Sequence, residues 1–226
     1  MVKNLLNLFF PDVCEACFQL LRDHESVICT SCRHQLPVTN FHFNGADDVK
    51  KVLYGRVRLE AATSLFHFAK KGLVQQLMHN LKYRGHQQIS QCLGEWLGSE
   101  LKASQIFLEA EVVVPVPLHK KRLRKRGYNQ VDLFGRAIAL ALDIPYEDKV
   151  LLKVKSTQTQ VFKQRLKRWN QDDGLFSIRD QHTLKDKHIL IVDDIITTGA
   201  TIEQCATCLK QIEGVKFSLA TMAITD

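Results

Sequence analysis

Residues 188–201, HILIVDDIITTGAT, restrict the fold of this chain more than any other stretch. The part ILIV is apolar without alternation, which is typical of a strand buried on both faces of a parallel sheet. Two carboxylates, Asp193 and Asp194, close this strand, and a hydroxyl-rich turn around Gly199 leads into a helical pattern. We therefore expect a parallel sheet covered by helices, with this turn at the carboxyl ends of its strands.

The turn after this strand has the chemistry of an anion site. Backbone N–H groups of a tight turn and the positive end of a helix dipole attract phosphate, and hydroxyls add donors. A plain helix cap would explain one Asp or Thr, but not two adjacent carboxylates and three threonines around a glycine. We therefore expect the turn to bind phosphate. Its residues are Ile195, Ile196, Thr197, Thr198, Gly199, Ala200 and Thr201.

The same stretch resembles the phosphoribosyl pyrophosphate (PRPP) signature of type I phosphoribosyltransferases. That signature has four apolar residues, an acidic pair, two apolar residues, two small residues, glycine, any residue, and Ser or Thr. Residues 189–201 match it throughout. The resemblance implies that Asp193 and Asp194 are catalytic, facing the ribose hydroxyls and stabilising positive charge on the anomeric carbon. It also implies that residues 197–201 hold the 5′-phosphate and that Mg²⁺ accompanies PRPP.

The strand and acidic pair also look like the start of a response-regulator receiver domain. That fold needs several further strand–helix units after the pair to supply its remaining site residues. Only 32 residues follow Asp194, which is room for one helix and one strand. We therefore set the receiver interpretation aside.

Four of the seven cysteines form two matched pairs, Cys14-x-x-Cys17 and Cys29-x-x-Cys32. Two such pairs place four thiolates at the corners of a tetrahedron, the geometry of closed structural Zn²⁺ sites. Four unrelated buried thiols or a redox pair fit this spacing poorly. We expect a structural zinc in a module of residues 1–45, too small to fold without the metal.

A third pair, Cys205 and Cys208, lies in the helix expected after the phosphate turn. At this spacing both thiols lie on one side of a helix, most often the core side, where cysteine packs as a small apolar residue. Metal binding is the alternative for this pair.

We expect neither export nor membrane insertion. The apolar part of the N-terminus, LLNLFF, is short and interrupted by Asn7, and no apolar run approaches the roughly 18–20 residues of a transmembrane helix. A cytoplasmic location with reduced thiols follows. With 45% hydrophobic and 24% charged residues, the chain can bury a globular core.

The net charge of +7 is concentrated in two strips, residues 119–126 (HKKRLRKR) and 163–168 (KQRLKR). Such an excess favours anionic partners. The first strip follows a strand expected over 111–118 and precedes a helix expected over 130–142. Three interpretations remain open for it: a site for the pyrophosphate end of a ligand, a solvated basic face, or a patch that tracks nucleic-acid phosphates.

The block VPVPLHKKRLRKRGYNQ resembles that of ComF-family competence proteins, in which a four-cysteine zinc module precedes a phosphoribosyltransferase-like domain. The resemblance extends to the N-terminal LFFP-x-x-Cys-x-x-Cys and to Thr157-x-x-Gln160 with Arg168, whereas KQRLKRW departs from the family pattern. It implies a pyrophosphate or substrate side of the site within the basic block. The candidates there are Lys120, Arg122, Arg126, Asn129 and Gln130.

We therefore expect an α/β fold: a type I phosphoribosyltransferase-like, Rossmann-type parallel sheet in residues 46–226, after the small four-cysteine zinc module. Its strands are expected over 111–118, 151–155, 188–193 and 215–224. Residues 61–69 could form a further strand, and 41–60 look like a linker. Further helices are expected over 72–83 and 87–103. The candidate for a mobile loop covering the site is 153–176.

Two functions of different class remain open. One is an enzyme of DNA uptake and natural transformation, a phosphoribosyltransferase that moves ribose 5-phosphate from PRPP to an unidentified acceptor with Mg²⁺. The other is a non-catalytic accessory protein that binds single-stranded DNA and competence-machinery proteins such as a helicase through zinc and basic surfaces. Asp193 and Asp194 favour a working ribose-phosphate site, whereas the basic excess suits DNA.

Overall fold

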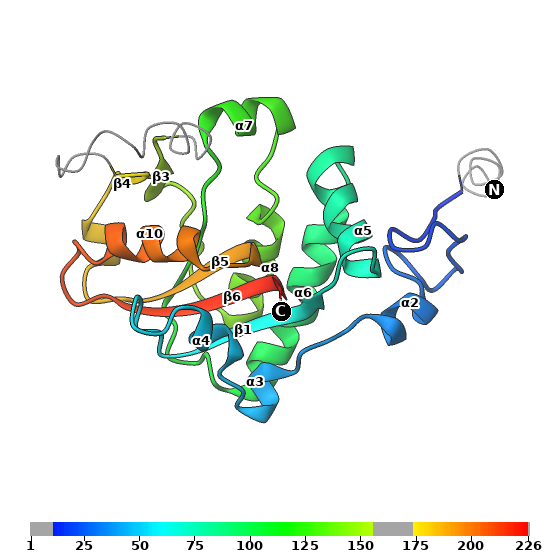
Figure 1. Ribbon diagram of the computed structural model, residues 1–226, viewed down its shortest axis with the longest axis horizontal. Coiled ribbons are helices and arrows are strands. Elements are labelled where there is room, and N and C mark those ends of the chain that lie inside the picture. The colour runs from blue at the N-terminus through cyan, green and yellow to red at the C-terminus, as the bar shows by residue number, and fades with distance from the viewer. Residues whose placement is uncertain (1–10, 156–173, 226) are drawn as a thin grey trace.

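The centre of the computed structural model, which describes residues 11–155 and 174–225, is a four-stranded parallel sheet ordered β1–β6–β5–β2 (Figure 1). Every neighbouring pair of strands is parallel. The α/β class with a parallel sheet is therefore confirmed. The strands are β1 (Ala62–Phe68), β2 (Val112–Pro115), β5 (His188–Ile196) and β6 (Lys216–Thr225).

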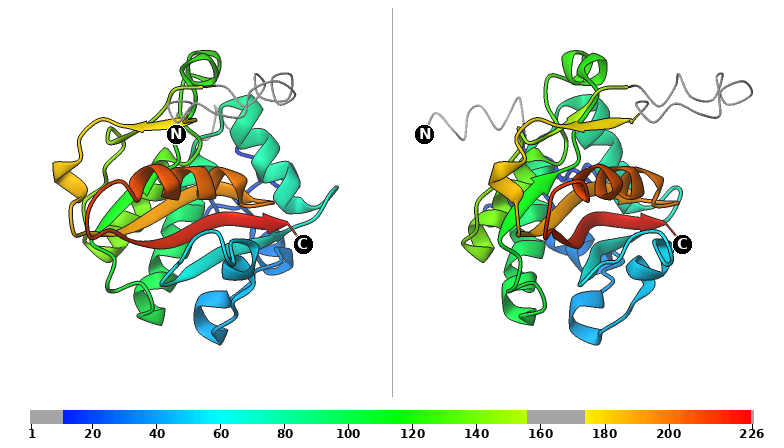
Figure 2. Two further views of the ribbon diagram at one scale, coloured as in Figure 1. Left: turned by 60° about the vertical axis from the view of Figure 1, so that its left-hand side comes forward. Right: turned by 90° about the vertical axis from the view of Figure 1, so that its left-hand side faces the viewer.

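The strand β5 is buried on both faces because its apolar side chains alternate between two cores. Leu190 packs in one core with α6 (Gln88–Ser104) and α8 (Asp132–Leu142). Ile191 packs in the other core with α10 (Ala200–Leu209). Figure 2 shows helices on both sides of the sheet. The uninterrupted apolar run that precedes the acidic pair is explained by this two-sided burial.

Glycines allow α8 to lie close to both α6 and the sheet. A Cβ on Gly94 of α6 would stand 2.6 Å from the carbonyl oxygen of Phe134, and one on Gly135 would stand 2.9 Å from Cγ2 of Val192. Neither position accepts a side chain without movement of its neighbours. The start of α8 is thereby fixed beside β5, near the acidic pair.

A strand does form within residues 151–155, but the prediction that it belongs to the parallel sheet is wrong. β3 (Leu151–Lys153) instead pairs antiparallel with β4 (Phe176–Ile178) in a separate two-stranded ribbon. The fourth strand of the sheet is β1, along β6. Lys153 lies opposite Phe176, so the ribbon joins the ends of the expected mobile loop. Residues 156–173 of that loop lie outside the described residues.

The glycines and aspartates of residues 41–60 predict a linker, but the structure shows a folded segment. They contain α3 (Phe41–Asn44) and α4 (Asp48–Val52), and Leu53 is fully buried. Leu53 packs in the same core as α10 and lies near Gly199 of the expected phosphate turn. The turn-forming residues therefore separate short helices that pack on the domain.

The segment before α3 covers the outer edge of β1. Val38 forms an antiparallel bridge with Phe66. The N–H of Thr39 donates to the Leu65 carbonyl oxygen at 3.0 Å, and the N–H of His67 donates to the Pro37 carbonyl oxygen at 2.8 Å. Chain that follows the cysteine pairs therefore takes part in the hydrogen bonding of the sheet.

The remaining helices are short. One of them, α7, is formed by residues 120–126 of the basic strip. The segment expected as one helix over 72–83 is an α-helix followed by a wide π-helical turn. No helix within residues 11–155 and 174–225 is long and apolar enough to cross a bilayer. These helices are α2 (Thr30–Gln35), α5 (Leu73–His79), the π-helix Asn80–Arg84, α7 (Lys120–Arg126) and the 3-10 helix His182–Leu184.

Candidate functional site

The acidic pair lies in the second half of β5, beyond the end of its neighbour β2. β2 pairs with β5 as far as Pro115, which lies opposite Val192. Asp193 and Asp194 follow directly, and each is only 8% exposed. Two carboxylates this deeply buried need hydrogen bonds or cations to be stable.

Asp194 meets this requirement with partners from two distant segments. Its Oδ2 lies 2.8 Å from Lys82 Nζ and accepts a hydrogen bond from Gln130 Nε2 at 2.7 Å. Arg126 donates to Oε1 of the same glutamine. The carboxylate therefore ties β5 to the π-helix and to the start of α8, and α7 is joined through Gln130.

Asp193 is held differently. Burial raises its pKa to about 8, the negative charge of Asp194 adds to this rise, and Lys82 and Lys153 oppose it. Burial also lowers the pKa of the Lys153 amine. A carboxyl group in this environment is largely protonated at neutral pH and gains from any cation that approaches it.

The turn between β5 and α10 requires glycine at one position. Gly199 has a φ of +73°, and a Cβ there would stand 2.7 Å from Leu53 Cδ2. The neighbouring Thr197 and Thr198 are exposed at the surface. The turn therefore leaves both threonines accessible to solvent just before α10, and phosphate binding there stays a prediction.

Arg56 fastens this turn from outside. Its Nη2 donates to the Thr198 carbonyl oxygen at 2.8 Å, and its Nη1 lies 2.8 Å from Glu203 Oε2 on α10. The same guanidinium also donates to the carbonyl oxygen of Val52. A single side chain thus joins α4, the turn and the first part of α10.

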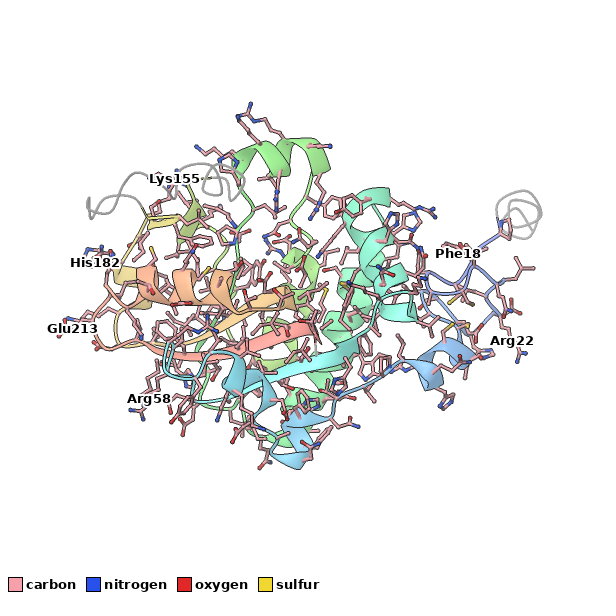
Figure 3. All side chains as sticks on the ribbon, viewed as in Figure 1. Phe18, Arg22, Arg58, Lys155, His182 and Glu213 are labelled. Atoms are coloured by element: carbon pink, nitrogen blue, oxygen red, sulfur yellow. The ribbon has the colours of Figure 1, made fainter. Side chains whose placement is uncertain are left out.

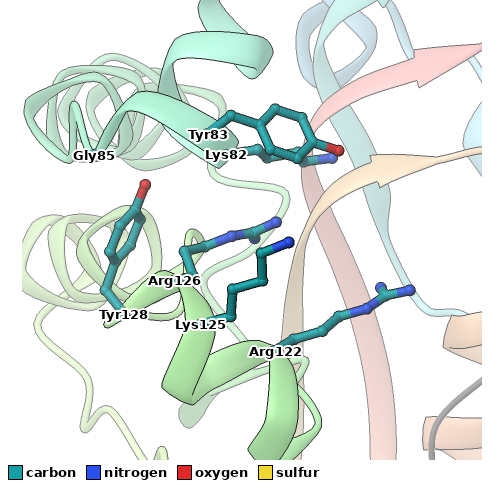
Figure 4. Close-up of a pocket in the computed structure, with 7 residues that line it drawn as sticks. All are labelled: Lys82, Tyr83, Gly85, Arg122, Lys125, Arg126 and Tyr128. Atoms are coloured by element: carbon teal, nitrogen blue, oxygen red, sulfur yellow. The ribbon is translucent and has the colours of Figure 1, made fainter.

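A cavity of about 440 Å³ is lined by cationic and aromatic side chains (Figure 4). The side chains of Arg122, Lys125 and Arg126 extend from α7 to the same side of it. Lys82 both lines the cavity and pairs with Asp194, so the cationic hollow and the acidic pair share a residue. The lining residues are Lys82, Tyr83, Gly85, Arg122, Lys125, Arg126 and Tyr128.

The residues expected on the pyrophosphate side have different positions. Arg122 and Arg126 line the cavity, and Gln130 contacts Asp194. Asn129 donates from Nδ2 to a backbone carbonyl just beyond β2 at 3.1 Å, while its buried Oδ1 has no partner among the described residues. Lys120 begins α7 and is not part of the cavity lining.

Sequence reasoning missed Lys82, Tyr83 and Arg56. The expected helix over 72–83 ends with Lys82 and Tyr83 and assigns them no role, and the expected linker over 41–60 does the same for Arg56. The available signal was the run Lys82-Tyr83-Arg84-Gly85, in which two cations and an aromatic residue precede a helix-ending glycine with a φ of +83°. Nothing comparable marks Arg56, because its partners are distant in sequence.

The four N-terminal cysteines form a compact cluster. Their sulfur atoms all lie within 4.8 Å of one another, and those of Cys17 and Cys29 are 3.8 Å apart. A tetrahedron with Zn–S bonds of about 2.3 Å has edges of about 3.8 Å. Backbone N–H groups of Cys29 and Cys32 donate to the sulfurs of Cys14 and Cys29. The donor set therefore fits a closed four-sulfur metal site.

The protein environment already favours a thiolate at one corner of the cluster. Burial raises the pKa of Cys14, but N–H donation from Cys29, Ala16 and Cys17 outweighs burial and lowers this pKa to about 7. Cys32, in contrast, has a pKa raised mainly by burial and by hydrogen bonds with neighbouring cysteines. A dication would favour ionisation of all four thiols.

Cys205 and Cys208 are buried in the core around α10, and burial raises the pKa of both thiols. Among the described residues, the only group of three or more metal-ligating side chains is the N-terminal cluster. A packing role therefore accounts for this third pair.

Known proteins resemble the chain in its second half and, less strongly, along most of its length. A family model described as Phosphoribosyl transferase domain matches residues 133–224. Competence protein F of Haemophilus influenzae is 33% identical over 103 residues, 45% of this chain and 45% of that protein. Competence protein ComFC of Bacillus subtilis is 26% identical over 214 residues, 89% of this chain and 85% of that protein. The chain is a homologue of these competence proteins.

Another relative is the DNA utilization protein YhgH of Escherichia coli K12, 25% identical over 201 residues, or 87% of this chain and 83% of that protein. Among solved structures, the adenine phosphoribosyltransferase of Saccharomyces cerevisiae is 18% identical, with a TM-score of 0.39 and coverage of 61% of this chain and 69% of that one. Residues 133–224 thus match a phosphoribosyl transferase domain within a chain that is similar to competence proteins along most of its length.

We predict that Asp193→Asn alters stability in a pH-dependent way. The folded-state pKa of Asp193 is raised from 3.8 to about 8, so between these values the folded chain holds a proton that the unfolded chain has lost. Its contribution is fully present below the lower value and is lost as the pH rises towards the upper one. Wild-type stability should therefore fall relative to the variant between about pH 4 and about pH 8, as measured by urea unfolding across that range.

Asp48→Asn is the control for this measurement, because Asp48 is exposed on α4. It should show no such trend. A stability difference between wild type and Asp193→Asn that stays constant across the pH range would contradict the raised pKa.

Proposed function

We propose that this protein binds PRPP, or a related phosphoribosyl ligand, at the carboxyl edge of β5. The observation that carries the proposal is the position of Asp193 and Asp194 between the turn of residues 197–201 and a cavity lined by cations. A ribose carrying a 5′-phosphate at one end and a pyrophosphate at the other has the matching order of charges. The turn would hold the 5′-phosphate and the cavity the pyrophosphate.

In the proposed reaction, the bond between the anomeric carbon and pyrophosphate breaks and a nucleophile takes the place of pyrophosphate. Asp194, and Asp193 once an approaching cation has favoured the loss of its proton, stabilise the positive charge that develops on the ribose, while Arg122 and Arg126 neutralise the departing pyrophosphate. The two carboxylates also offer the oxygen donors that Mg²⁺ prefers, and the bound ion would neutralise further phosphate charge. The class of reaction is transfer of ribose 5-phosphate to an acceptor.

We further propose that this site serves DNA uptake and natural transformation in the cytoplasm. The support lies in the names of the relatives, which describe competence and DNA utilization. The four-cysteine cluster would carry a structural Zn²⁺, because four sulfur ligands leave no open coordination position for chemistry.

Mg²⁺ with PRPP should raise the thermal midpoint of the wild type by several degrees at concentrations far above Kd, because a ligand that binds only the folded state stabilises it. The double variant Asp193→Asn/Asp194→Asn should lose this increase. Differential scanning fluorimetry measures both proteins with and without ligand. The matched control is Asp47→Asn/Asp48→Asn, an exposed adjacent pair that should keep the wild-type response. Equal midpoint increases in wild type and site variant would contradict the proposed ligand site.

The zinc assignment predicts about one Zn²⁺ per purified chain. Cys14→Ser/Cys29→Ser removes two of the four sulfurs and should abolish most of the bound metal, as measured by inductively coupled plasma mass spectrometry. Cys92→Ser is the control, since Cys92 lies outside the cluster. A double variant with undiminished zinc would refute the assignment.

A second candidate function is binding of single-stranded DNA, alongside the ligand site or in place of transfer. The observation that favours it is the exposure of Tyr83, whose side chain is 73% exposed beside the cavity. The Arg126 guanidinium lies 6.0 Å from the centre of its ring. Aromatic rings beside cations are the elements that bind unpaired bases and phosphates. Protein partners of the competence machinery, such as a helicase, belong to the same proposal.

For the DNA candidate, affinity for a single-stranded oligonucleotide should fall linearly with the logarithm of salt concentration, because counterions are released from the phosphates. Tyr83→Ala should weaken binding by roughly 1–3 kcal/mol through loss of base stacking. Tyr54→Ala should leave binding unchanged, since Tyr54 is exposed but does not line the cavity. Fluorescence anisotropy tests both, and a salt-independent affinity would exclude DNA as the ligand.

A further inference from the structure

Glu15 lies between the first two cysteines of the metal-binding cluster and is buried, with 5% exposed. Its carboxylate accepts hydrogen bonds from three side chains of one segment, residues 80–88. The donors are His86 Nδ1 at 2.6 Å, Gln88 Nε2 at 2.8 Å and Asn80 Nδ2 at 3.2 Å. Such convergence on one buried carboxylate marks a specific docking contact between this segment and residues 14–32, which contain the four cysteines and are called the cysteine hairpin below.

The cluster itself does not explain this contact. Four sulfurs complete a closed metal site, and the backbone N–H of Glu15 is already used within the hairpin, where it donates to the Val27 carbonyl oxygen at 3.0 Å. The Glu15 carbonyl oxygen accepts a further hydrogen bond from Asn80 Nδ2 at 2.9 Å. Both the main chain and the side chain of Glu15 therefore hold the segment 80–88.

A neighbouring contact joins the same two parts of the chain. The guanidinium of Arg84, at the end of the π-helix, lies 5.6 Å from the centre of the Phe18 ring. Phe18 directly follows Cys17 in the cysteine hairpin, which is placed beside α5 in Figure 3. The hairpin thus contacts both ends of the π-helix.

The segment held in this way carries Lys82. Its ammonium lies 2.8 Å from Asp194 Oδ2 and lines the cavity. The π-helix Asn80–Arg84 that presents it has wider turns than an α-helix, a conformation that is rare without support from surrounding structure and is frequent at functional sites. Glu15 provides that support on one side, and the Tyr128 hydroxyl donates to the Leu81 carbonyl oxygen on the other.

We propose that Glu15 is a positioning residue, which anchors the segment 80–88 and thereby holds the Lys82 ammonium at Asp194 and in the cavity. The four-cysteine hairpin then acts as the fixed support of the ligand site rather than as a separate module. The identity of the ligand rests on the proposed function, but the placement of Lys82 does not. Lys82 would pair with Asp194 when the site is empty and meet the anionic end of the ligand when it is filled.

The first test uses no ligand. The rate at which acetic anhydride modifies each lysine is measured by mass spectrometry in wild type, Glu15→Gln and Glu25→Gln. Glu15→Gln keeps the side-chain shape but removes the charge that three donors share, so the rate at Lys82 should rise several-fold while that at Lys125 stays constant. Glu25→Gln is the matched control, because the hydrogen-bond donors to Glu25 belong to Arg22 and Thr30, within the hairpin itself.

A milder second variant covers the case in which Glu15→Gln does not fold. Gln88→Ala removes one of the three donors at an exposed position and should raise the Lys82 rate by a smaller factor. Zinc content is measured for each variant, so that loss of the metal is distinguished from loss of the contact. An unchanged Lys82 rate in every folded Glu15 and Gln88 variant that retains zinc would overturn the proposal.

The second test asks whether Glu15 acts through Lys82. Isothermal titration calorimetry with magnesium pyrophosphate should show about a tenfold weaker affinity for Glu15→Gln, and no further loss when the same change is made in Lys82→Met. Additive losses would assign Glu15 a merely structural role and overturn the proposal. If wild type binds neither pyrophosphate nor PRPP while Glu15→Gln still exposes Lys82, the positioning role stands and the proposed function fails.

Discussion

The ion pair and the hydrogen bond of the buried Asp194 carboxylate organise the candidate site. Asp194 is nearly inaccessible to solvent, and its Oδ2 contacts both Lys82 and Gln130. These residues come from segments that lie 112 and 64 positions earlier in the chain. Burying a charge without such partners would be costly. The requirement of this one oxygen therefore brings the π-helix and the start of α8 to the carboxyl edge of β5.

The two acidic residues carry different properties although they are adjacent. Asp194 has a cation and an amide at its carboxylate, whereas the pKa of Asp193 is raised by burial and by the charge of Asp194. Asp193 is therefore the group whose charge a bound cation would change, while Asp194 keeps the surrounding segments in place. The two side chains are equally exposed, so the division comes from their different partners and not from their burial.

How much of this could be predicted from the sequence depended on whether the signal was local. The strand β5, its turn and α10 form one continuous stretch with a distinct pattern, and the two cysteine pairs carry their spacing with them. Lys82 lies in a run of two cations and an aromatic residue, but this run does not reveal the contact with Asp194, which is distant in sequence. The place of a strand within a sheet likewise depends on partner strands that are distant in sequence.

Two errors have the same physical origin. The apolar residues at 151–153 do form a strand, but it pairs with β4 because β1 occupies the free edge of β6. Residues 41–60 have a turn-rich composition, yet Leu53 fills the space beside Gly199. Composition describes the local preference of a segment, whereas packing decides where that segment is placed.

Residues 37–39 form hydrogen bonds with β1, so the sheet domain depends on chain that precedes residue 45. The residues proposed to contact the ligand all lie after residue 45, yet Val38 and its neighbours occupy the outer edge of the sheet. An exposed edge strand is a template for pairing with other chains. The chain before residue 45 therefore covers this edge and keeps its backbone N–H and C=O groups from pairing with another copy of the chain.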